Sequence, residues 1–177
     1  LPPRLELVLK NIVELLAAIP SVIYGLWGIF VVIPMIRPVA NWLHHHLSWI
    51  PFFETSLSGP GMLPAALVLA IMILPTVSAI SRDALVAVPH KLKEAAFGLG
   101  ATRWEVIMAV LVPTASTGIF GAVILAFGRA LGETMALAML VGNSNQLSVS
   151  LFSPGNTLAA LLANNFPEAG RTEEQVL

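Results

Sequence analysis

Charged residues are scarce in this sequence, and cysteine is absent from it. Only 11% of the 177 residues are charged, whereas soluble domains carry roughly 25% charged residues. This deficit is too large for a domain whose whole surface faces water. The lack of cysteine excludes disulfides and cysteine-based metal sites. The net charge of −1 favours neither a nucleic-acid partner nor an acidic substrate tail.

The motifs of common catalytic and metal sites are also missing. The sequence has no Gly-rich phosphate loop of the GxxxxGK[ST] type, so we expect that the chain does not hydrolyse ATP by itself. It has no Ser/His/Asp or HExxH arrangement for hydrolysis in a membrane. His44, His45 and His46 are adjacent, and consecutive residues point in different directions, which favours an exposed outer loop over a metal site. We therefore expect no catalytic residue, no metal and no cofactor.

Apolar sequence is what the chain has in abundance. Hydrophobic residues make up 56% of it, and the mean hydropathy is +0.84. A helix needs about 20 apolar residues to cross a bilayer. Stretches of that length cover residues 12–36, 62–81 and 115–141, while residues 157–166 are too few to span and indicate an interfacial or re-entrant helix. The sequence thus predicts an all-α polytopic membrane protein, whose two ends have the character of cuts in a longer chain.

Lysine and arginine are unevenly distributed between the connections. Residues 82–105 carry four of them and residues 1–11 carry two, whereas residues 37–61 carry only Arg37. Positive charge collects in loops on the cytoplasmic side of a membrane. We therefore expect residues 82–105 to form a cytoplasmic loop and residues 37–61 to lie on the periplasmic side.

The cytoplasmic loop is expected to contain a short helix. Pro89 is a plausible helix start, and residues 91–97 have an amphipathic pattern. Gly98 and Gly100 are expected to end this helix, because glycine is conformationally permissive. A second helix is expected to begin near Thr102 and to carry the chain back toward the bilayer. The result is a short helix lying across the cytoplasmic face between two spans.

A spaced motif runs through the same segment. Glu-Ala-Ala at residues 94–96 is followed after three residues by glycine, and after nine more by Val-Leu-Val-Pro. This pattern resembles the EAA motif of bacterial ABC importer permeases, in which Ile and Leu stand where this chain has Val110 and Val112. The matching residues are Glu94, Ala95, Ala96, Gly100 and Pro113.

The resemblance implies that this segment is a coupling helix, which docks into a groove of a cytosolic ATPase. The small side chains of Ala95 and Ala96 would permit close approach, and Glu94 could pair with a basic group on the ATPase. Gly100 would belong to the same coupling element. The alternative is an ordinary charged helical hairpin between two spans.

The third predicted span contains two charged residues. Arg129 lies near its middle, where an ionised side chain costs a few kcal/mol or more unless it is paired or wet. Glu133 follows four residues later, so on one continuous helix the two would face the same way and could pair. Small residues recur along the same span and would let a neighbouring helix approach closely; they are Gly118, Gly121, Gly128 and Gly132. The pair is either a structural pin between helices or a polar element of a translocation path.

Four segments extend the resemblance to nearly the whole chain. Residues 128–136 (GRALGETMA) and 14–28 (ELLAAIPSVIYGLWG) look like the matching parts of permeases of the phosphate-specific (Pst) ABC importer, particularly the C-type subunit. Residues 70–75 and 154–156 do so as well. The resemblance implies the type I ABC importer permease (MetI-like) fold. Relative to that family, the early spans and the last span are missing from this sequence.

The resemblance also implies a function and partners. Arg129 and Glu133 fall on the positions associated with phosphate passage in that family. The chain would be a permease subunit in the bacterial inner membrane, paired with a second, similar permease. A cytosolic ATPase dimer would drive it, and a periplasmic binding protein would deliver inorganic phosphate. The alternatives are a permease for another oxyanion such as molybdate or sulfate, an ion-coupled secondary transporter, or an integral membrane enzyme.

Overall fold

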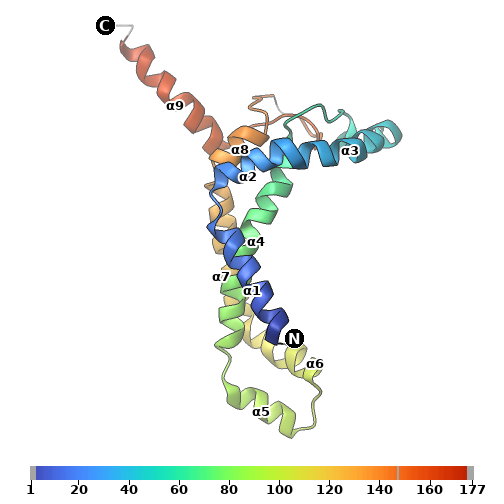
Figure 1. The fold of residues 1–177 in the computed structure, drawn as a ribbon, viewed down its shortest axis with the longest axis vertical. Helices are drawn as coiled ribbons and strands as arrows, with labels where there is room; N and C mark the ends of the chain where they lie inside the picture. Colours follow the sequence, from blue (N-terminus) through green and yellow to red (C-terminus); the bar gives the residue numbers. More distant parts are fainter. Residues whose placement is uncertain (1–2, 147, 175–177) are drawn as a thin grey trace. The chain divides into compact units, whose positions relative to one another are not determined.

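The computed structural model describes the backbone of residues 3–146 and 148–174, and the side chains of residues 4–146 and 148–166. All regular structure in these residues is helical, which confirms the predicted all-α class. The chain divides into two compact units (Figure 1). Unit 1 comprises residues 1–17 and 73–129, and unit 2 comprises residues 18–72 and 130–177.

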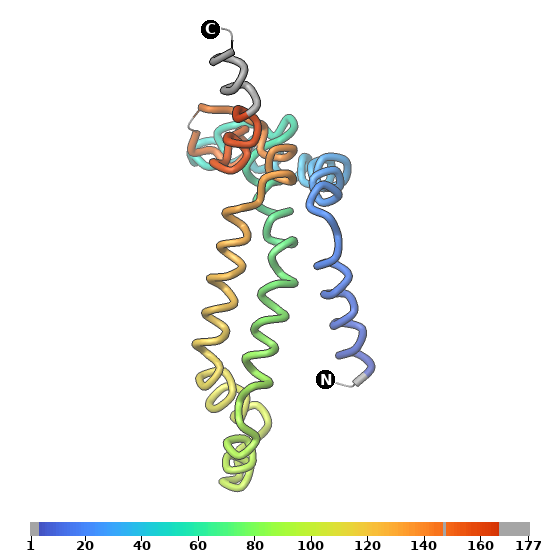
Figure 2. Tube along the Cα trace, turned by 90° about the vertical axis from the view of Figure 1, so that its left-hand side faces the viewer, coloured from blue at the N-terminus to red at the C-terminus, as the bar shows by residue number. Residues whose placement is uncertain are grey.

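Unit 1 contains helix α1 (Pro3–Ala18, up to residue 17), the second part of α4 (Met62–Val86) and the helices that follow it. These are α5 (His90–Gly98), α6 (Arg103–Glu105), the π-helical segment η3 (Val106–Leu111) and α7 (Val112–Leu131). In Figures 1 and 2, α4 and α7 run side by side. A Cβ added to Gly118 of α7 would lie 2.5 Å from the Cβ of Ala84 in α4. Gly118 therefore permits this close approach, as the small-residue pattern predicts.

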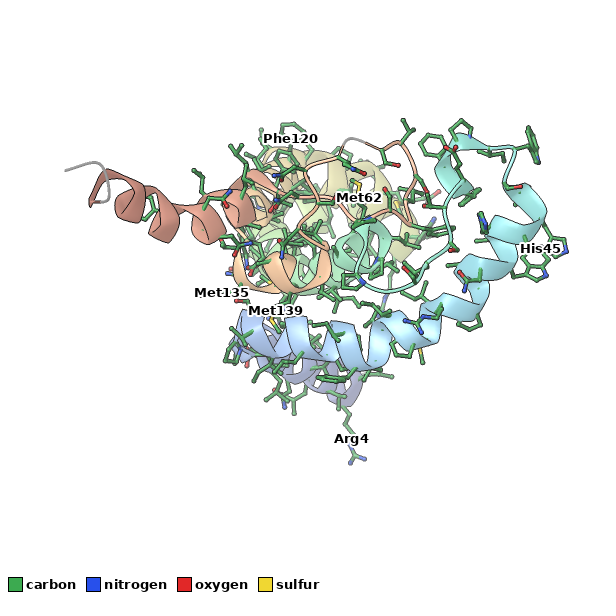
Figure 3. All side chains as sticks on the ribbon, turned by 90° about the horizontal axis from the view of Figure 1, so that it is seen from above. Arg4, His45, Met62, Phe120, Met135 and Met139 are labelled. Atoms are coloured by element: carbon green, nitrogen blue, oxygen red, sulfur yellow. The ribbon has the colours of Figure 1, made fainter. Side chains whose placement is uncertain are left out.

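Unit 2 is built on a long helix that packs across α8 (Met135–Leu140). The long helix comprises α2 (Ser21–Trp27), the π-helical segment η1 (Gly28–Val32) and α3 (Ile33–Leu47). A Cβ added to Gly28 would lie 2.6 Å from a Leu140 methyl group, and one added to Gly25 would lie 2.9 Å from the sulfur of Met139, which points toward α2 in Figure 3. The common core contains Tyr24, Val32 and Ile33 of the long helix, Ala65, Val68 and Met72 of α4, and Leu137, Leu140 and Val141.

The connections of unit 2 are joined by hydrogen bonds between residues far apart in sequence. The first backbone N–H groups of α4 have no partner within the helix. Met62 donates to the carbonyl of Ser153 at 3.1 Å, and Leu63 donates to that of Leu151 at 2.8 Å. A second core contains Ala40, Leu57 and Phe152, and Leu63 and Leu151 pack against it. The short 3₁₀ helix η2 (Pro51–Phe53) and helix α9 (Leu158–Glu174) complete the unit.

Each π-helical segment ends two residues before a proline. Proline has no N–H, and its ring clashes with the carbonyl four residues back. A widened turn makes room for the ring, and such turns occur as single π-bulges inside α-helices. The residue before each proline donates its N–H to the carbonyl five positions back, from Ile33 to Gly28 and from Val112 to Ile107. Pro34 and Pro113 are thereby accommodated within continuous helices.

Within the described residues, three helices are long and apolar enough to cross a membrane: Ser21–Leu47, Met62–Val86 and Arg103–Leu131. The second agrees with the predicted span at residues 62–81. The first and third predicted spans, residues 12–36 and 115–141, are each interrupted in the structure. Helix α1 ends at Ala18, and α2 begins after Pro20, whose backbone is extended (ψ 141°).

The third span ends earlier than its hydropathy predicts. Helix α7 stops at Leu131, and α8 starts at Met135. The predicted short helix at residues 157–166 extends to Glu174 as α9. The adjacent histidines lie on α3 and not in a loop, so that expectation was wrong. The ring of His44 bonds the Phe53 carbonyl at 2.8 Å, and His45 points outward at the edge of unit 2 (Figure 3).

Candidate functional site

The predicted coupling helix is present as α5. It begins after Pro89, whose extended backbone (ψ 133°) caps it, and its last helical residue is Gly98. Gly98 therefore belongs to the helix, and the chain turns only at Gly100. The sequence placed the helix start correctly and the stop within two residues.

Gly100 ends α5 through its backbone conformation. Its φ is +84°, in the left-handed region that side chains with a Cβ rarely adopt. The N–H of Gly100 donates to the Phe97 carbonyl at 3.0 Å, and the N–H of Ala101 donates to the Ala96 carbonyl at 3.1 Å. These two bonds form a Schellman motif. A Cβ at Gly100 would meet nothing within 4 Å, so within this chain the glycine is required by the turn and not by space.

The next helix begins with a capping box that the sequence reasoning did not identify. The N–H of Thr102 donates to Glu105 Oε2 at 2.7 Å, and the N–H of Glu105 donates to Thr102 Oγ1 at 3.3 Å. The signal was present in the sequence as Thr-x-x-Glu. Together with the Schellman motif, it fixes both ends of the turn between α5 and the helix leading to α7.

Helix α5 presents its motif residues on the outside of unit 1. It packs against η3, where Val88 and Val106 are buried. Glu94 and Ala95 are exposed, and Ala96 is half-buried. Glu94 makes no ion pair within the described residues. Apolar side chains beside the motif are open as well, since Leu92 is 43% exposed and Leu99 is 90% exposed. This surface combines a free carboxylate with small and apolar groups.

Arg129 and Glu133 are not on one helix. Arg129 lies in the last turn of α7 and is exposed, whereas Glu133 follows the end of that helix and is half-buried. Glu133 Oε1 accepts a hydrogen bond from the N–H of Ala136 at 3.3 Å, so its side chain caps the start of α8. The boundary between the two units falls directly after Arg129. The helical spacing that suggested the pair does not hold here, and the pairing itself stays a prediction.

A groove of about 550 Å³ lies between α1 and α4 within unit 1. Charges of both signs line it. Glu6 and Arg82 pair at 2.8 Å, Lys10 and Glu14 pair at 3.6 Å, and Asp83 stands beside them. Because acidic groups outnumber basic ones, this groove is a poor site for an anion, and we do not assign it to a substrate path. No cluster of residues that could hold a metal ion occurs in the described part of the chain.

Comparison with known families decides the class of the protein. The sequence model of the binding-protein-dependent transport system inner membrane component matches residues 1–163. The chain belongs to this family. An inner-membrane transport component with several membrane helices is what the sequence predicted, and the family assignment confirms it.

Curated relatives of this family member carry a more specific name. The phosphate transport system permease protein PstC of Xylella fastidiosa strain Temecula1 is 44% identical over 181 residues, which cover 99% of this chain and 56% of that protein. The protein of the same name from Haemophilus influenzae is 49% identical over 173 residues, covering 93% of this chain and 54% of that protein. A probable PstC of Methanocaldococcus jannaschii is 42% identical over 170 residues, covering 95% and 54%.

These matches confirm the resemblance to phosphate permeases of the C type. The chain spans about half the length of the curated relatives it matches. No solved structure matches it.

Proposed function

We propose that this chain forms the coupling segment and part of the translocation path in the permease of an ATP-driven importer of inorganic phosphate. The observation that carries the proposal is the exposed, sharply terminated helix α5 with the Glu-Ala-Ala motif, in a chain whose relatives are named phosphate permeases. The names of those relatives favour phosphate over molybdate or sulfate. A secondary transporter would have no use for an ATPase-docking motif.

The partners follow from the same reading. Residues 82–105 face the cytoplasm, and a cytosolic ATPase dimer receives α5 in a groove. Glu94 pairs with a basic group of the ATPase, while Ala95 and Ala96 permit close approach. A second, similar permease completes the membrane part, and a periplasmic binding protein delivers phosphate. Closure of the ATPases moves the coupling helices and alternates access to the path.

Arg129 is the residue we propose for contact with phosphate. Its planar guanidinium presents several N–H donors in a fork that matches an oxyanion. Glu133 balances this charge near the path. Arg129 is exposed in this chain, at the end of a helix that crosses the membrane in our proposal. Near a helix end, the long arginine side chain can extend to the membrane–water interface, so its guanidinium can stay hydrated and open to an anion.

The deciding experiment is phosphate uptake in cells whose only high-affinity importer carries the variants. We expect the double variant Arg129→Gln with Glu133→Gln to assemble in the membrane and to lose uptake, because the positive charge facing phosphate is gone. Arg4→Gln, which removes an exposed arginine of α1, is the matched control and should transport normally. Normal uptake by the double variant would leave Arg129 as a structural pin.

Coupling is tested separately with Glu94→Lys. We expect uptake to fail while the protein still inserts, because a reversed charge would repel the basic group on the ATPase. Co-purification of the ATPase with this variant, compared with the unchanged protein, reports docking directly. Undiminished co-purification and uptake would contradict the coupling assignment and leave a charged hairpin.

Orientation can be measured in the full-length protein with an impermeant thiol reagent. We expect Ser58→Cys to be labelled from outside intact cells and Leu99→Cys to be labelled only after permeabilisation. Both positions are exposed, and residues 1–177 contain no cysteine; any cysteine elsewhere in the full-length protein is first replaced by serine. The reverse pattern would overturn the cytoplasmic assignment of α5.

A further inference from the structure

The long helix Ser21–Leu47 of unit 2 carries an apolar stripe that nothing in the unit covers. Its members recur every three or four residues along one face, and each is more than 40% exposed. We call this set the outer stripe; it consists of Ile23, Trp27, Val31, Met35, Val39 and Trp42. The core-facing residues Tyr24, Val32 and Ala40 each follow a member of the outer stripe, so they form a separate stripe about 100° around the helix from it.

Along α3, the opposite flank of the helix is polar and is covered by the connection that follows α3. Arg37 donates to the Ser58 carbonyl at 2.6 Å, and the N–H of Leu57 donates to the Asn41 side chain at 3.0 Å. His44 bonds the Phe53 carbonyl from the same side. In Figure 1 this connection passes over α3 on the side away from the course of α4. The buried stripe therefore separates a polar flank under the connection from an apolar flank that is open.

Within unit 2, the long helix runs crosswise to α4. Figure 1 shows it from the side, and Figure 3 shows it lengthwise with α4 seen along its axis. It packs on α4 between Ala65 and Met72, which lie about 5 to 15 Å along the axis from the start of α4 at Met62. If α4 crosses the bilayer, a helix crosswise to it at this level lies in the membrane plane near one surface.

The polar residues of the long helix also argue against a crossing. The apolar part before Arg37, residues 21–36, is 16 residues long and would reach about 24 Å, short of the roughly 30 Å of hydrocarbon. Three histidines and an asparagine follow before the helix ends. Interfacial helices bury an apolar face about 5 to 10 Å into the headgroup boundary, and tryptophan is enriched at that level.

We propose that helix Ser21–Leu47 lies along the membrane–water interface, with its outer stripe in contact with lipid, and does not cross the bilayer. The occupant of the stripe is the headgroup and upper acyl region of the leaflet in which α4 begins. The polar flank, with Arg37 and the connection to α4, faces water. This assignment depends only on the membrane location of the family and not on the transported substrate.

Spin labels on single cysteines test the proposal in the full-length protein reconstituted in lipid, with any native cysteine outside residues 1–177 first replaced by serine. Labels at Ile23, Val31 and Val39 cover about 24 Å of helix axis. Their immersion depth is obtained from the accessibility to oxygen and to an aqueous nickel complex. We expect the three depths to agree within about 5 Å, one helical turn, close to the headgroup level. A second set at Trp27, Met35 and Trp42 repeats the profile, so that no single perturbed variant decides the result.

Helix α4 supplies the matched control. Met62, Leu67 and Leu74 are exposed on α4, and labels there should deepen by up to about 18 Å from the first to the last. A similar steady change along the outer stripe would show that Ser21–Leu47 crosses the bilayer and would overturn the proposal. Labels shielded from both oxygen and nickel would mean that a protein partner covers the stripe. Labels accessible only to the nickel complex would place the outer stripe in water. Each of these two results, a shielded stripe or a stripe in water, would refute lipid contact.

Discussion

The predicted coupling segment, residues 88–105, and the connections of unit 2, residues 48–61, 142–146 and 148–157, hold their shapes in opposite ways. In the coupling segment, the described backbone bonds around Gly100 and Thr102 join residues three to five apart. In the unit 2 connections, Thr55 bonds Ser150 across 95 positions of sequence, and Leu151 bonds Phe52. The first region is defined by local sequence, and the second is defined only once the unit has assembled.

Burial follows the same division. Leu57, Ser150 and Phe152 are each 2% exposed or less, while Leu99 and Trp104 in the coupling segment are 90% and 66% exposed. If α5 docks on a partner as we propose, its surface needs a shape that is stable without covering contacts. Short-range hydrogen bonds provide such a shape, and they leave the side chains free.

The largest effect is expected in the second core of unit 2. Phe152→Ala removes a buried ring whose centroid lies 5.6 Å from that of Phe53. Truncation of a buried phenylalanine costs about 3 to 5 kcal/mol. The melting temperature of the purified full-length protein should fall markedly. Phe120→Ala, at a ring 67% exposed on α7, is the control and should change it little. Equal effects would contradict the buried role of Phe152.

Truncation of Ser150 should have the second largest effect, because its hydroxyl forms hydrogen bonds with residues of both connections. It lies 2.6 Å from Thr55 Oγ1, donates to the Phe52 carbonyl at 3.3 Å and accepts from the Phe152 N–H at 3.4 Å. Ser150→Ala leaves buried polar groups without partners, at a cost of about 1 to 3 kcal/mol. Thermal unfolding measures it, and Ser48→Ala, at an exposed serine of the connection after α3, should lie within about 0.5 kcal/mol of the unchanged protein.

Two glycines of the coupling segment should respond with opposite signs. Gly100→Ala forces a Cβ into the left-handed region and should cost about 1 to 2 kcal/mol. Gly98→Ala lies within α5 in open space and should stabilise that helix by about 0.5 to 1 kcal/mol. Amide hydrogen exchange of residues 95–101 reports both. The Schellman assignment fails if Gly100→Ala leaves exchange unchanged or slows it.

The smallest effect is expected at the capping box. Thr102→Ala removes the oxygen that accepts the Glu105 N–H, and loss of a cap corresponds to about fivefold faster local exchange. Thr102→Ser keeps the hydroxyl and should exchange nearly as the unchanged protein does. Because the box is local, neither variant should alter exchange in the unit 2 connections. A change in amide exchange in the unit 2 connections would contradict the conclusion that the shape of the coupling segment is set locally.

Sequence reasoning located α4, α5 and the turn at Gly100 because proline, glycine and hydropathy act within a few residues. It missed the break at Glu133. Residues 115–141 carry no charge except at Arg129 and Glu133, and hydropathy does not register that a carboxylate can cap a new helix at Ala136. It also placed the histidines in a loop. In the structure, His44 bonds Phe53 and Asn41 bonds Leu57, so α3 is held against the connection that follows it. A local pattern does not reveal such contacts.

The sequence by itself determined the membrane class, the family and the local shape of the coupling segment. Composition excludes a wetted domain, and bonds between near neighbours need no tertiary support. Only the tertiary structure decided that Gly28 and Gly118 lie against other helices, whereas Gly121 and Gly128 meet nothing within 4 Å of a built Cβ. It also decided that Ser150 is a buried junction and that an apolar stripe on Ser21–Leu47 is left open. Those outcomes depend on which distant segments pack together. The periodicity of a helical sequence indicates which residues share a face, but it does not indicate which segment packs against that face.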